Sequence, residues 1–307
     1  MIAIKARRIL TGAVAVLSAA ALAGCSSGNP LDGGSDTGGS ETITVGSAAF
    51  SENEILADIY GQALAANGFT VDYRLNIGQR EAYIPAIKSG EIDLIPEYTG
   101  NLLTFLNPDA EETTPSDVLT ALKSALPDEL EVLEPSKAED KDSLNVTAEF
   151  AAEHDLVSIA DLKGIGPFTV GANPEFQTRS YGIPGMERVY GITDAGFKAI
   201  NDSGGPATLK ALLDGTIQVA DIYSTTPSIL ANKLVTLEDP KGMIAAQQVV
   251  PLISSAKASD AVQAVLDKVS AALTTSDLIQ LNTRVSGDEK ADPATAAEDW
   301  LEKANLF

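Results

Sequence analysis

Short apolar runs alternate with amphipathic segments along most of the chain, and this alternation predicts a series of strands and helices. A helix is expected to begin at Ser51, because Ser51 and Glu54 have the spacing of a capping box. A second helix is expected to stop at Gly90, a residue type common just after a helix end. The predicted strands are 42–47, 69–75 and 92–96, and the second helix spans 80–89. Strands that alternate with helices form right-handed βαβ units on a parallel sheet.

The same pattern occurs a second time, 125 residues further along. Ile43-Thr44-Val45-Gly46 matches Phe168-Thr169-Val170-Gly171, and Gly90-Glu91-Ile92 matches Gly215-Thr216-Ile217. The second copy predicts strands at 168–172, 197–200 and 217–222 and helices near 179–190 and over 206–214. A shared register over so many positions indicates two similar α/β lobes.

The remainder of the chain continues with two strand-like runs, 234–238 and 248–253, and then turns helical. Asp292-Pro293 is typical of a capped helix start, and the helix that follows carries Trp300. At this spacing Trp300 is expected to be a core residue rather than a ligand platform.

Tyr98 and Tyr223 occupy equivalent positions in the two copies, each just past the end of a predicted third strand. Ligands of open parallel sheets collect beyond the carboxyl ends of the strands. Two lobes that face each other would therefore close a cleft with one tyrosine on either wall. Glu91, Asp93 and Glu97 are expected on a solvated or capped face of the third strand.

The first 41 residues differ in character from the rest. Three basic residues, Lys5, Arg7 and Arg8, precede 16 apolar or small residues, which is too short for a comfortable membrane span and typical of a secretory signal over 1–24. Leu22-Ala23-Gly24-Cys25 resembles the bacterial lipobox, in which the cysteine is acylated; a plain cleavage site beside an unrelated cysteine is the alternative. Residues 25–41 are rich in Gly and Ser and predict a flexible, lipidated tether. We expect an extracytoplasmic protein anchored to the outer face of the cytoplasmic membrane through Cys25.

Charge and composition exclude several classes of function. The net charge of −22 opposes binding to nucleic acid. With His154 as the only histidine and Cys25 as the only cysteine, triads and common zinc sites are not expected, and no cofactor is predicted. Gly164-Ile165-Gly166 lacks the third glycine of a dinucleotide fingerprint. The sequence therefore predicts a binding protein and not an enzyme.

The segment 90–100, which contains Pro96-Glu97-Tyr98-Thr99-Gly100, resembles the osmoprotectant-binding proteins of ABC transporters, the glycine betaine/choline/carnitine group. Further similar segments continue in order from residue 42 to about 301, among them Pro184-Gly185 and Ala220-Asp221. The resemblance implies a two-lobed, type II periplasmic-binding-protein-like α/β fold, with two parallel-rich sheets flanked by helices, a hinge and a central cleft. It also implies a monomer that delivers a small solute to an ABC permease and its ATPase. We expect one lobe from 42–140 plus 245–307 and the other from 141–244.

The resemblance further implies which residues meet the solute. Tyr98 and Tyr223 match members of a tyrosine cage that holds a quaternary ammonium by its electron-rich ring faces. Arg179 matches the arginine that grips a carboxylate, and Asn101 stands where a threonine often contacts the same group. Ser47 and Phe50 belong to a similar segment and are further candidates. Arg80, at a strand-to-helix turn, is expected either in the cleft or as a solvated helix-start residue.

Two of the four cage positions depart from the family pattern. Asp142 lies in the segment that commonly carries a third tyrosine, and Gln247 lies where a fourth aromatic usually follows. Either Phe50, Tyr83 or Tyr181 replaces the missing rings, or Asp142 and Gln247 serve a more hydrogen-bonding solute. A sensing or adhesive surface lipoprotein without a permease stays a third alternative.

Overall fold

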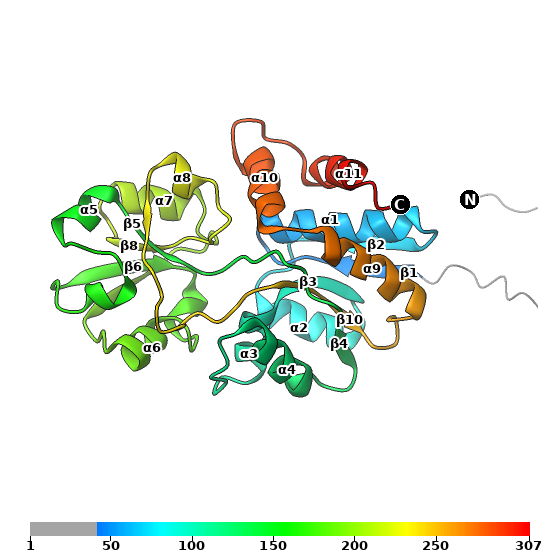
Figure 1. Ribbon diagram of the computed structural model, residues 1–307, viewed down its shortest axis with the longest axis horizontal. Coiled ribbons are helices and arrows are strands. Elements are labelled where there is room, and N and C mark those ends of the chain that lie inside the picture. The colour runs from blue at the N-terminus through cyan, green and yellow to red at the C-terminus, as the bar shows by residue number, and fades with distance from the viewer. Residues whose placement is uncertain (1–41) are drawn as a thin grey trace, which may run out of the picture. The chain divides into compact units, whose positions relative to one another are not determined.

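The computed structural model describes residues 42–307, in which two five-stranded sheets form the centres of two lobes. The sheet of lobe 1 has the order β2-β1-β3-β10-β4, and the sheet of lobe 2 has the order β7-β6-β8-β5-β9 (Figure 1). Lobe 1 contains β1 (Thr42–Gly46), β2 (Thr70–Arg74), β3 (Leu94–Tyr98), β4 (Leu130–Val132) and β10 (Val249–Ser254). Lobe 2 contains β5 (Leu144–Val146), β6 (Phe168–Ala172), β7 (Ala195–Ala199), β8 (Val219–Asp221) and β9 (Val235–Thr236). The two-lobed α/β architecture expected from the sequence is confirmed.

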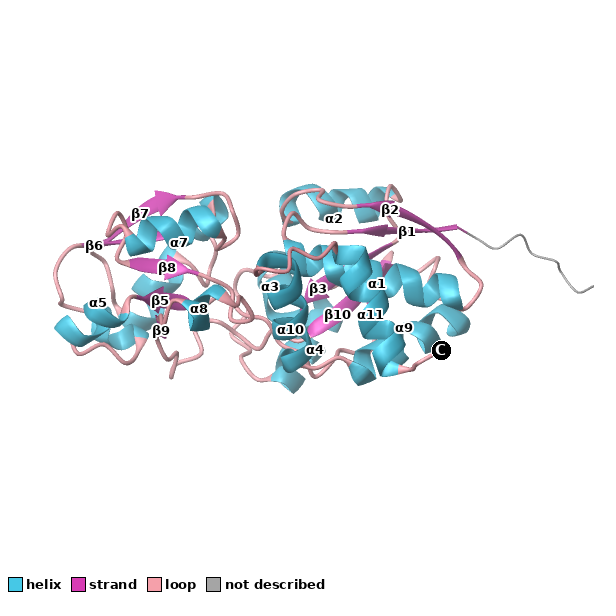
Figure 2. Ribbon diagram, turned by 90° about the horizontal axis from the view of Figure 1, so that it is seen from above, coloured by secondary structure: helices cyan, strands magenta, loops and turns pink. Residues whose placement is uncertain are grey.

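Helices cover both faces of each sheet (Figure 2). On lobe 1, one apolar cluster lies under α1 (Ser51–Ala66), α9 (Asp260–Ala272), α10 (Thr275–Ser286) and α11 (Pro293–Ala304), and another under α2 (Arg80–Ser89), α3 (Thr99–Leu106) and α4 (Pro115–Ala125). Lobe 2 carries α5 (Ala148–Glu153), α6 (Ile183–Gly185), α7 (Pro206–Leu213), α8 (Ser228–Ala231) and the short helices η1 (Ile159–Leu162), η2 (Pro174–Gln177) and η3 (Met186–Tyr190). Trp300 is buried in the first cluster, which confirms it as a core residue. No helix among residues 42–307 is long and apolar enough to cross a membrane.

The internal repeat is confirmed in atomic detail. β2 and β7 are 125 residues apart along their whole length, and β3 and β8 begin at the same spacing. In lobe 1 the Thr44 amide donates to the Asp93 carboxylate at 2.9 Å, and in lobe 2 the Thr169 amide donates to the Gln218 side chain at 3.0 Å. In each copy, the side chain of the residue before the third strand therefore accepts a main-chain hydrogen bond from the first strand. For Asp93 this confirms a capped position.

The fourth strand of each sheet runs antiparallel to its neighbour. β10 pairs with β3, and β5 pairs with β8, so each sheet is mixed rather than fully parallel. The chain reaches β5 after leaving lobe 1 and reaches β10 after leaving lobe 2, and the two crossing segments lie side by side, with the Asp140 amide donating to the Gln247 carbonyl at 3.2 Å. The limits 42–140 plus 245–307 and 141–244 stay predictions for the lobe boundaries.

Three local predictions were wrong. No side chain caps α1, because its N-cap is Phe50 rather than Ser51, and Glu54 instead accepts from Asn76. The helix expected from residue 179 begins at Ile183, because residues 179–182 form a turn in which Gly182 packs against the Phe176 carbonyl. A Cβ on Gly182 would lie 1.9 Å from that oxygen, so only glycine fits there. Glu97, expected on a solvated or capped face, is completely buried.

Candidate functional site

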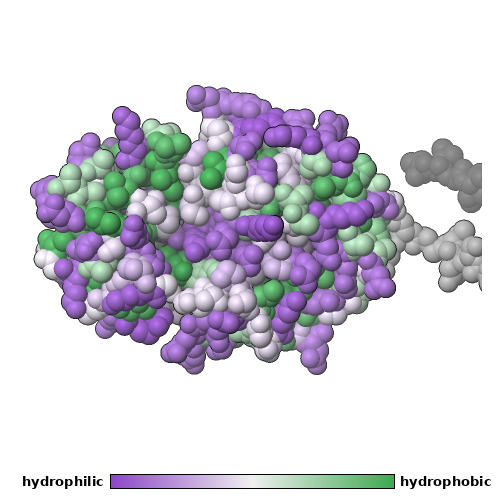
Figure 3. All heavy atoms as spheres, in the orientation of Figure 1, coloured by the Kyte–Doolittle hydropathy of each residue, from purple (hydrophilic) through white to green (hydrophobic). Residues whose placement is uncertain are grey.

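Two adjoining pockets lie between the lobes and share the lining residues Gln79, Arg80, Asn101, Asp142 and Tyr223. Lobe 1 contributes the first three from the start of α2 and from α3, and lobe 2 contributes the other two from segments beside β5 and β8. On the face drawn in Figure 3, hydrophilic residues gather where the two lobes meet. The free volume in each pocket is about 30 Å³, room for only a few water molecules. A solute would therefore have to part these side chains to enter.

We call the first pocket the aromatic pocket because rings form much of its wall. Its other lining residues are Ala48, Phe50, Tyr83, Tyr98 and Asp140. The Phe50 ring lies 6.1 Å from the Tyr98 ring and meets the Tyr223 ring edge-on at 5.3 Å, measured between ring centroids. Phe50 thus joins the tyrosine of one lobe to the tyrosine of the other. Tyr83 lines the same pocket, so two of the three aromatic substitutes considered from the sequence lie beside the tyrosine pair.

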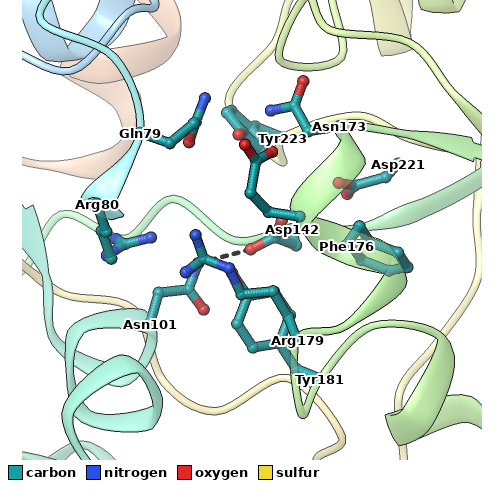
Figure 4. Close-up of a pocket in the computed structure, with 11 residues that line it drawn as sticks. Gln79, Arg80, Asn101, Asp142, Asn173, Phe176, Arg179, Tyr181, Asp221 and Tyr223 are labelled. Atoms are coloured by element: carbon teal, nitrogen blue, oxygen red, sulfur yellow. Dashed lines mark hydrogen bonds between the residues drawn. The ribbon is translucent and has the colours of Figure 1, made fainter. Parts of the chain in front are cut away.

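The second pocket, which we call the acidic pocket, extends into lobe 2. Its other lining residues are Asn173, Glu175, Phe176, Arg179, Tyr181 and Asp221 (Figure 4). In Figure 4 the Asp142 and Asp221 side chains come from the lobe 2 side, opposite Arg80 and Asn101. Tyr181, the third aromatic substitute considered, belongs to this pocket rather than to the aromatic one.

Arg80 is buried and forms an ion pair with Glu97, so it is not a solvated helix-start residue. Its guanidinium forms two hydrogen bonds with Glu97, Nε to Oε1 at 3.0 Å and an NH2 group to Oε2 at 2.7 Å. Glu97 also accepts from the Tyr83 hydroxyl at 2.7 Å and from the Tyr98 amide at 2.8 Å. Burial alone lowers the pKa of Arg80, but the charge of Glu97 raises it well above its usual value, so Arg80 stays charged. The pair positions both tyrosines and leaves little of the Arg80 charge for a solute.

Arg179 contacts lobe 1 across the cleft. One of its NH2 groups donates to both Glu81 carboxylate oxygens, at 3.0 and 3.1 Å, and its guanidinium lies 5.7 Å from the centre of the Phe105 ring. The other terminal nitrogen is buried without a hydrogen-bond partner among the described residues. Glu81 is thus bound where a solute carboxylate would be expected, and one donor group of Arg179 stays open.

Asn101 and Gln247 form a polar bridge at the crossing segments. The Asn101 side-chain amide donates to Asp142 at 2.7 Å, and its carbonyl accepts from Gln247 at 2.6 Å, while Gln247 also accepts from the Asn101 main-chain amide. Gln247 lines neither pocket and holds Asn101 from behind. Ser47, which follows β1, also lines neither pocket, and its hydroxyl accepts from the main-chain amide of Asn76 in the loop after β2.

Sequence reasoning missed a pair of carboxyl groups, Glu52 and Asp140, at the aromatic pocket, of which Asp140 lines the wall. Glu52 accepts from the Tyr98 hydroxyl at 2.8 Å, from the Thr225 hydroxyl at 2.5 Å and from the Asn282 side chain at 2.6 Å. Burial raises the pKa of Glu52, and burial together with the charge of Glu52 raises the pKa of Asp140 well above its usual value. Nothing in the sequence brings these residues together, since 88 positions separate them.

Taken together, the cleft offers rings, carboxyl groups and few free positive charges. Arg80 and Arg179 are both paired with carboxylates, whereas Asp142 and Asp221 face the cleft and form no salt bridge within the described part of the chain. Burial and the charge of Asp142 raise the pKa of Tyr223, so its phenol stays neutral and its ring electron-rich. Such a site suits a small cation.

Comparison with known proteins gives consistent matches over nearly the whole described chain. A family model for the substrate-binding domain of ABC-type glycine betaine transport systems matches residues 41–303. The glycine betaine-binding protein YehZ of Escherichia coli K12 is 28% identical over 276 residues, covering 85% of this chain and 90% of YehZ. The structure of apo YehZ from Escherichia coli superposes with a TM-score of 0.62 at 26% identity, covering 87% of this chain and all of that chain. A crystal structure of a glycine betaine/carnitine/choline ABC transporter protein, 20% identical, has the same fold, with a TM-score of 0.69 over 86% of this chain and 99% of that one.

Proposed function

Because this chain belongs to the family of substrate-binding domains of ABC-type glycine betaine transport systems, we propose that it captures a small quaternary ammonium solute between its lobes. The family consists of solute-binding proteins for membrane permeases and not of enzymes. One observation above all supports a quaternary ammonium. Phe50 lies between Tyr98 and Tyr223 and adds a third ring to the pocket that they line. Three rings from both lobes then face one pocket with two carboxyl groups, Asp140 and Asp142, in its wall.

In this proposal the solute binds the aromatic pocket through its cationic head. A quaternary ammonium donates no hydrogen bond, and ring faces attract it by their electron density. A carboxylate tail, where the solute has one, points to Arg179 and displaces Glu81 from it. Contacts made by both lobes favour the closed form, because the solute binds that form more tightly than the open one. Gln247 and Ser47 act behind the pocket rather than on the solute.

The test is calorimetric titration of the purified chain with glycine betaine, choline and carnitine, with amino acids and polyamines as controls. We expect Phe50→Ala and Tyr98→Ala each to weaken binding of a quaternary ammonium about 5- to 30-fold, because each removes one ring from the cation. Phe150→Ala is the matched control, since Phe150 packs on His154 in lobe 2 and lines neither pocket. Binding of an uncharged, hydrogen-bonding solute with no response to any quaternary ammonium would overturn the proposal.

We also propose that Cys25 is acylated and anchors a monomeric protein at the outer face of the cytoplasmic membrane. Residues 1–24, the tether 25–41 and Cys25 itself lie outside the described residues, so this rests on the lipobox-like sequence. Incorporation of labelled palmitate that is lost in Cys25→Ala tests the anchor, and sedimentation of the purified chain tests the monomer. Loss of solute uptake on deletion of the gene distinguishes a transport protein from a sensing or adhesive lipoprotein.

A further inference from the structure

Two carboxyl groups, Asp142 and Asp221, lie on the lobe 2 wall of the acidic pocket, and the strand register explains why they meet. β5 and β8 are antiparallel, with Leu144 opposite Asp221. Two further hydrogen bonds, Ile222 amide to Ser143 carbonyl and Ser224 amide to Lys141 carbonyl, extend this ladder toward the cleft. In that register Asp142 stands opposite Tyr223. Because side chains alternate along a strand, Asp142, Asp221 and Tyr223 project from the same face.

The two carboxyl groups differ in what holds them. Asp142 accepts a hydrogen bond from the Asn101 side chain of lobe 1 at 2.7 Å. Asp221 is only 4% exposed, and its Oδ1 atom is buried without a hydrogen-bond partner among residues 42–307. A buried acceptor without a donor is costly, so folds rarely keep one unless a ligand or water supplies the donor. Asp221 lines the acidic pocket, which is where such a donor would arrive.

The charges around Asp221 show what kind of donor fits. Burial, followed by the charge of Asp142, raises the pKa of Asp221 well above its usual value. The raised pKa favours the protonated form of Asp221, in which one oxygen carries the proton and the other can accept a hydrogen bond. Both pocket arginines are paired with lobe 1 carboxylates, Arg80 with Glu97 and Arg179 with Glu81. Although one terminal nitrogen of Arg179 stays open, neither arginine forms a salt bridge with Asp221 within residues 42–307. The free oxygen thus accepts a hydrogen bond beside an aromatic wall that attracts cations.

We propose that Asp221, held by Asp142, accepts a hydrogen bond from the solute, so that the protein prefers cationic solutes with a hydroxyl or N–H donor over fully methylated ones with none. This rests on the proposed function and names the class of ammonium solute that the same site selects. The proposal also accounts for Asp142, which lies where relatives are expected to carry a further aromatic ring. In this chain that position holds the carboxyl group next to Asp221. Glycine betaine, which has no donor, would leave Oδ1 of Asp221 unpaired.

The test compares pairs of solutes that differ by one donor, by calorimetry on the purified chain. The hydroxyl pairs are carnitine with 4-trimethylammoniobutanoate and choline with propyltrimethylammonium, and the N–H pair is N,N-dimethylglycine with glycine betaine. We expect the donor-bearing member of the hydroxyl or the N–H pairs to bind about tenfold more tightly or better, because a site built around an acceptor discriminates against a solute that leaves it unpaired. Which pairs respond shows whether a hydroxyl or an N–H is the group recognised.

Two substitutions at position 221 separate this subsite from general damage to the cleft. Asp221→Asn keeps the acceptor oxygen and donates its amide to Asp142, so we expect it to retain the discrimination. Asp221→Ala removes the oxygen, and we expect the two members of each pair to bind with nearly equal affinity. Asp194→Ala, an exposed site on lobe 2, is the control for charge removal.

Equal affinities within every pair in the unmodified protein would overturn the subsite and leave the proposed function standing. Discrimination that survives Asp221→Ala would also overturn it. Failure of every ammonium solute to bind would overturn the proposed function and this inference with it.

Discussion

The pair formed by Glu52 and Asp140 makes a quantitative prediction about pH. Glu52 is fully enclosed by donors from Tyr98, Thr225 and Asn282, and Asp140 lies beside it and accepts from the Thr225 amide at 3.1 Å. Burial is the main cause of the raised pKa of both carboxyl groups. The charge of Glu52 adds to the effect of burial at Asp140, so the folded protein binds protons more tightly than the unfolded chain, which releases them above about pH 4.

The sign of the effect follows from this difference in bound protons. Both groups have a folded pKa above the unfolded value, so their contribution to stability is fully present below the unfolded pKa and is lost as the pH rises toward the folded pKa. Each retained proton makes the free energy of unfolding fall by about 1.4 kcal/mol for each pH unit. Asp58 and Asp221 also have raised pKa values, so the slope of the unmodified protein includes their protons as well.

Glu52→Gln isolates the contribution of the pair. The substitution keeps the shape and one acceptor oxygen and removes the charge of Glu52, which is the second cause of the raised pKa of Asp140. We expect the slope of the free energy of unfolding against pH, above the unfolded pKa of about 4, to be shallower by up to about 1.4 kcal/mol per unit than in the unmodified protein. Urea unfolding at a series of pH values measures both slopes. Glu298→Gln, on the exposed face of α11, is the matched control and should leave the slope unchanged. Equal slopes in Glu52→Gln and the unmodified protein would refute the raised pKa values of the pair.

Three further substitutions test single contacts. Glu97→Gln leaves Arg80 buried without its counter-charge and should lower the free energy of unfolding by about 3–5 kcal/mol. Adding Arg80→Met should recover much of this loss. A loss under about 1 kcal/mol in Glu97→Gln would contradict the buried pair. Burial and two neighbouring carboxylates raise the pKa of Asp58 to about 6, so stability is lost as the pH rises from about 4 to 6. We therefore expect Asp58→Asn to raise the free energy of unfolding, measured with urea, by about 1–2 kcal/mol at pH 7.5 but not at pH 4. Equal gains at both pH values would contradict this assignment. Glu81→Gln releases Arg179 from its salt bridge, so carboxylate-bearing solutes should bind about 2- to 5-fold more tightly and choline with unchanged affinity. Calorimetric titration measures both affinities. Tighter binding of choline would instead indicate a general opening of the cleft.

The residues of the candidate site could be predicted only in part from the sequence. Tyr98 and Tyr223 occupy equivalent positions at the carboxyl ends of β3 and β8, so the repeat itself predicts that they face each other across a cleft. The use of Phe50 as the ring between them depends on packing, because Phe50 precedes α1 while Tyr223 follows β8. Arg80 illustrates the limit of local reasoning. Its position before a helix suits a solvated residue equally well, and only the fold brings Glu97 beneath it.

Local and repeated features were determined by the sequence alone. The alternation of apolar and polar residues specifies strands and helices, and the spacing of 125 residues specifies two lobes of equal topology, because both depend on neighbours within a few turns or on a copy of the same unit. The tertiary structure decided which carboxyl groups are buried together. Glu52 meets Asp140, and Asp142 meets Asp221, only after both crossings of the chain are in place. Their charges, their protons and the solute they suit depend on burial and distance between segments far apart in the chain, which no local pattern of residues encodes.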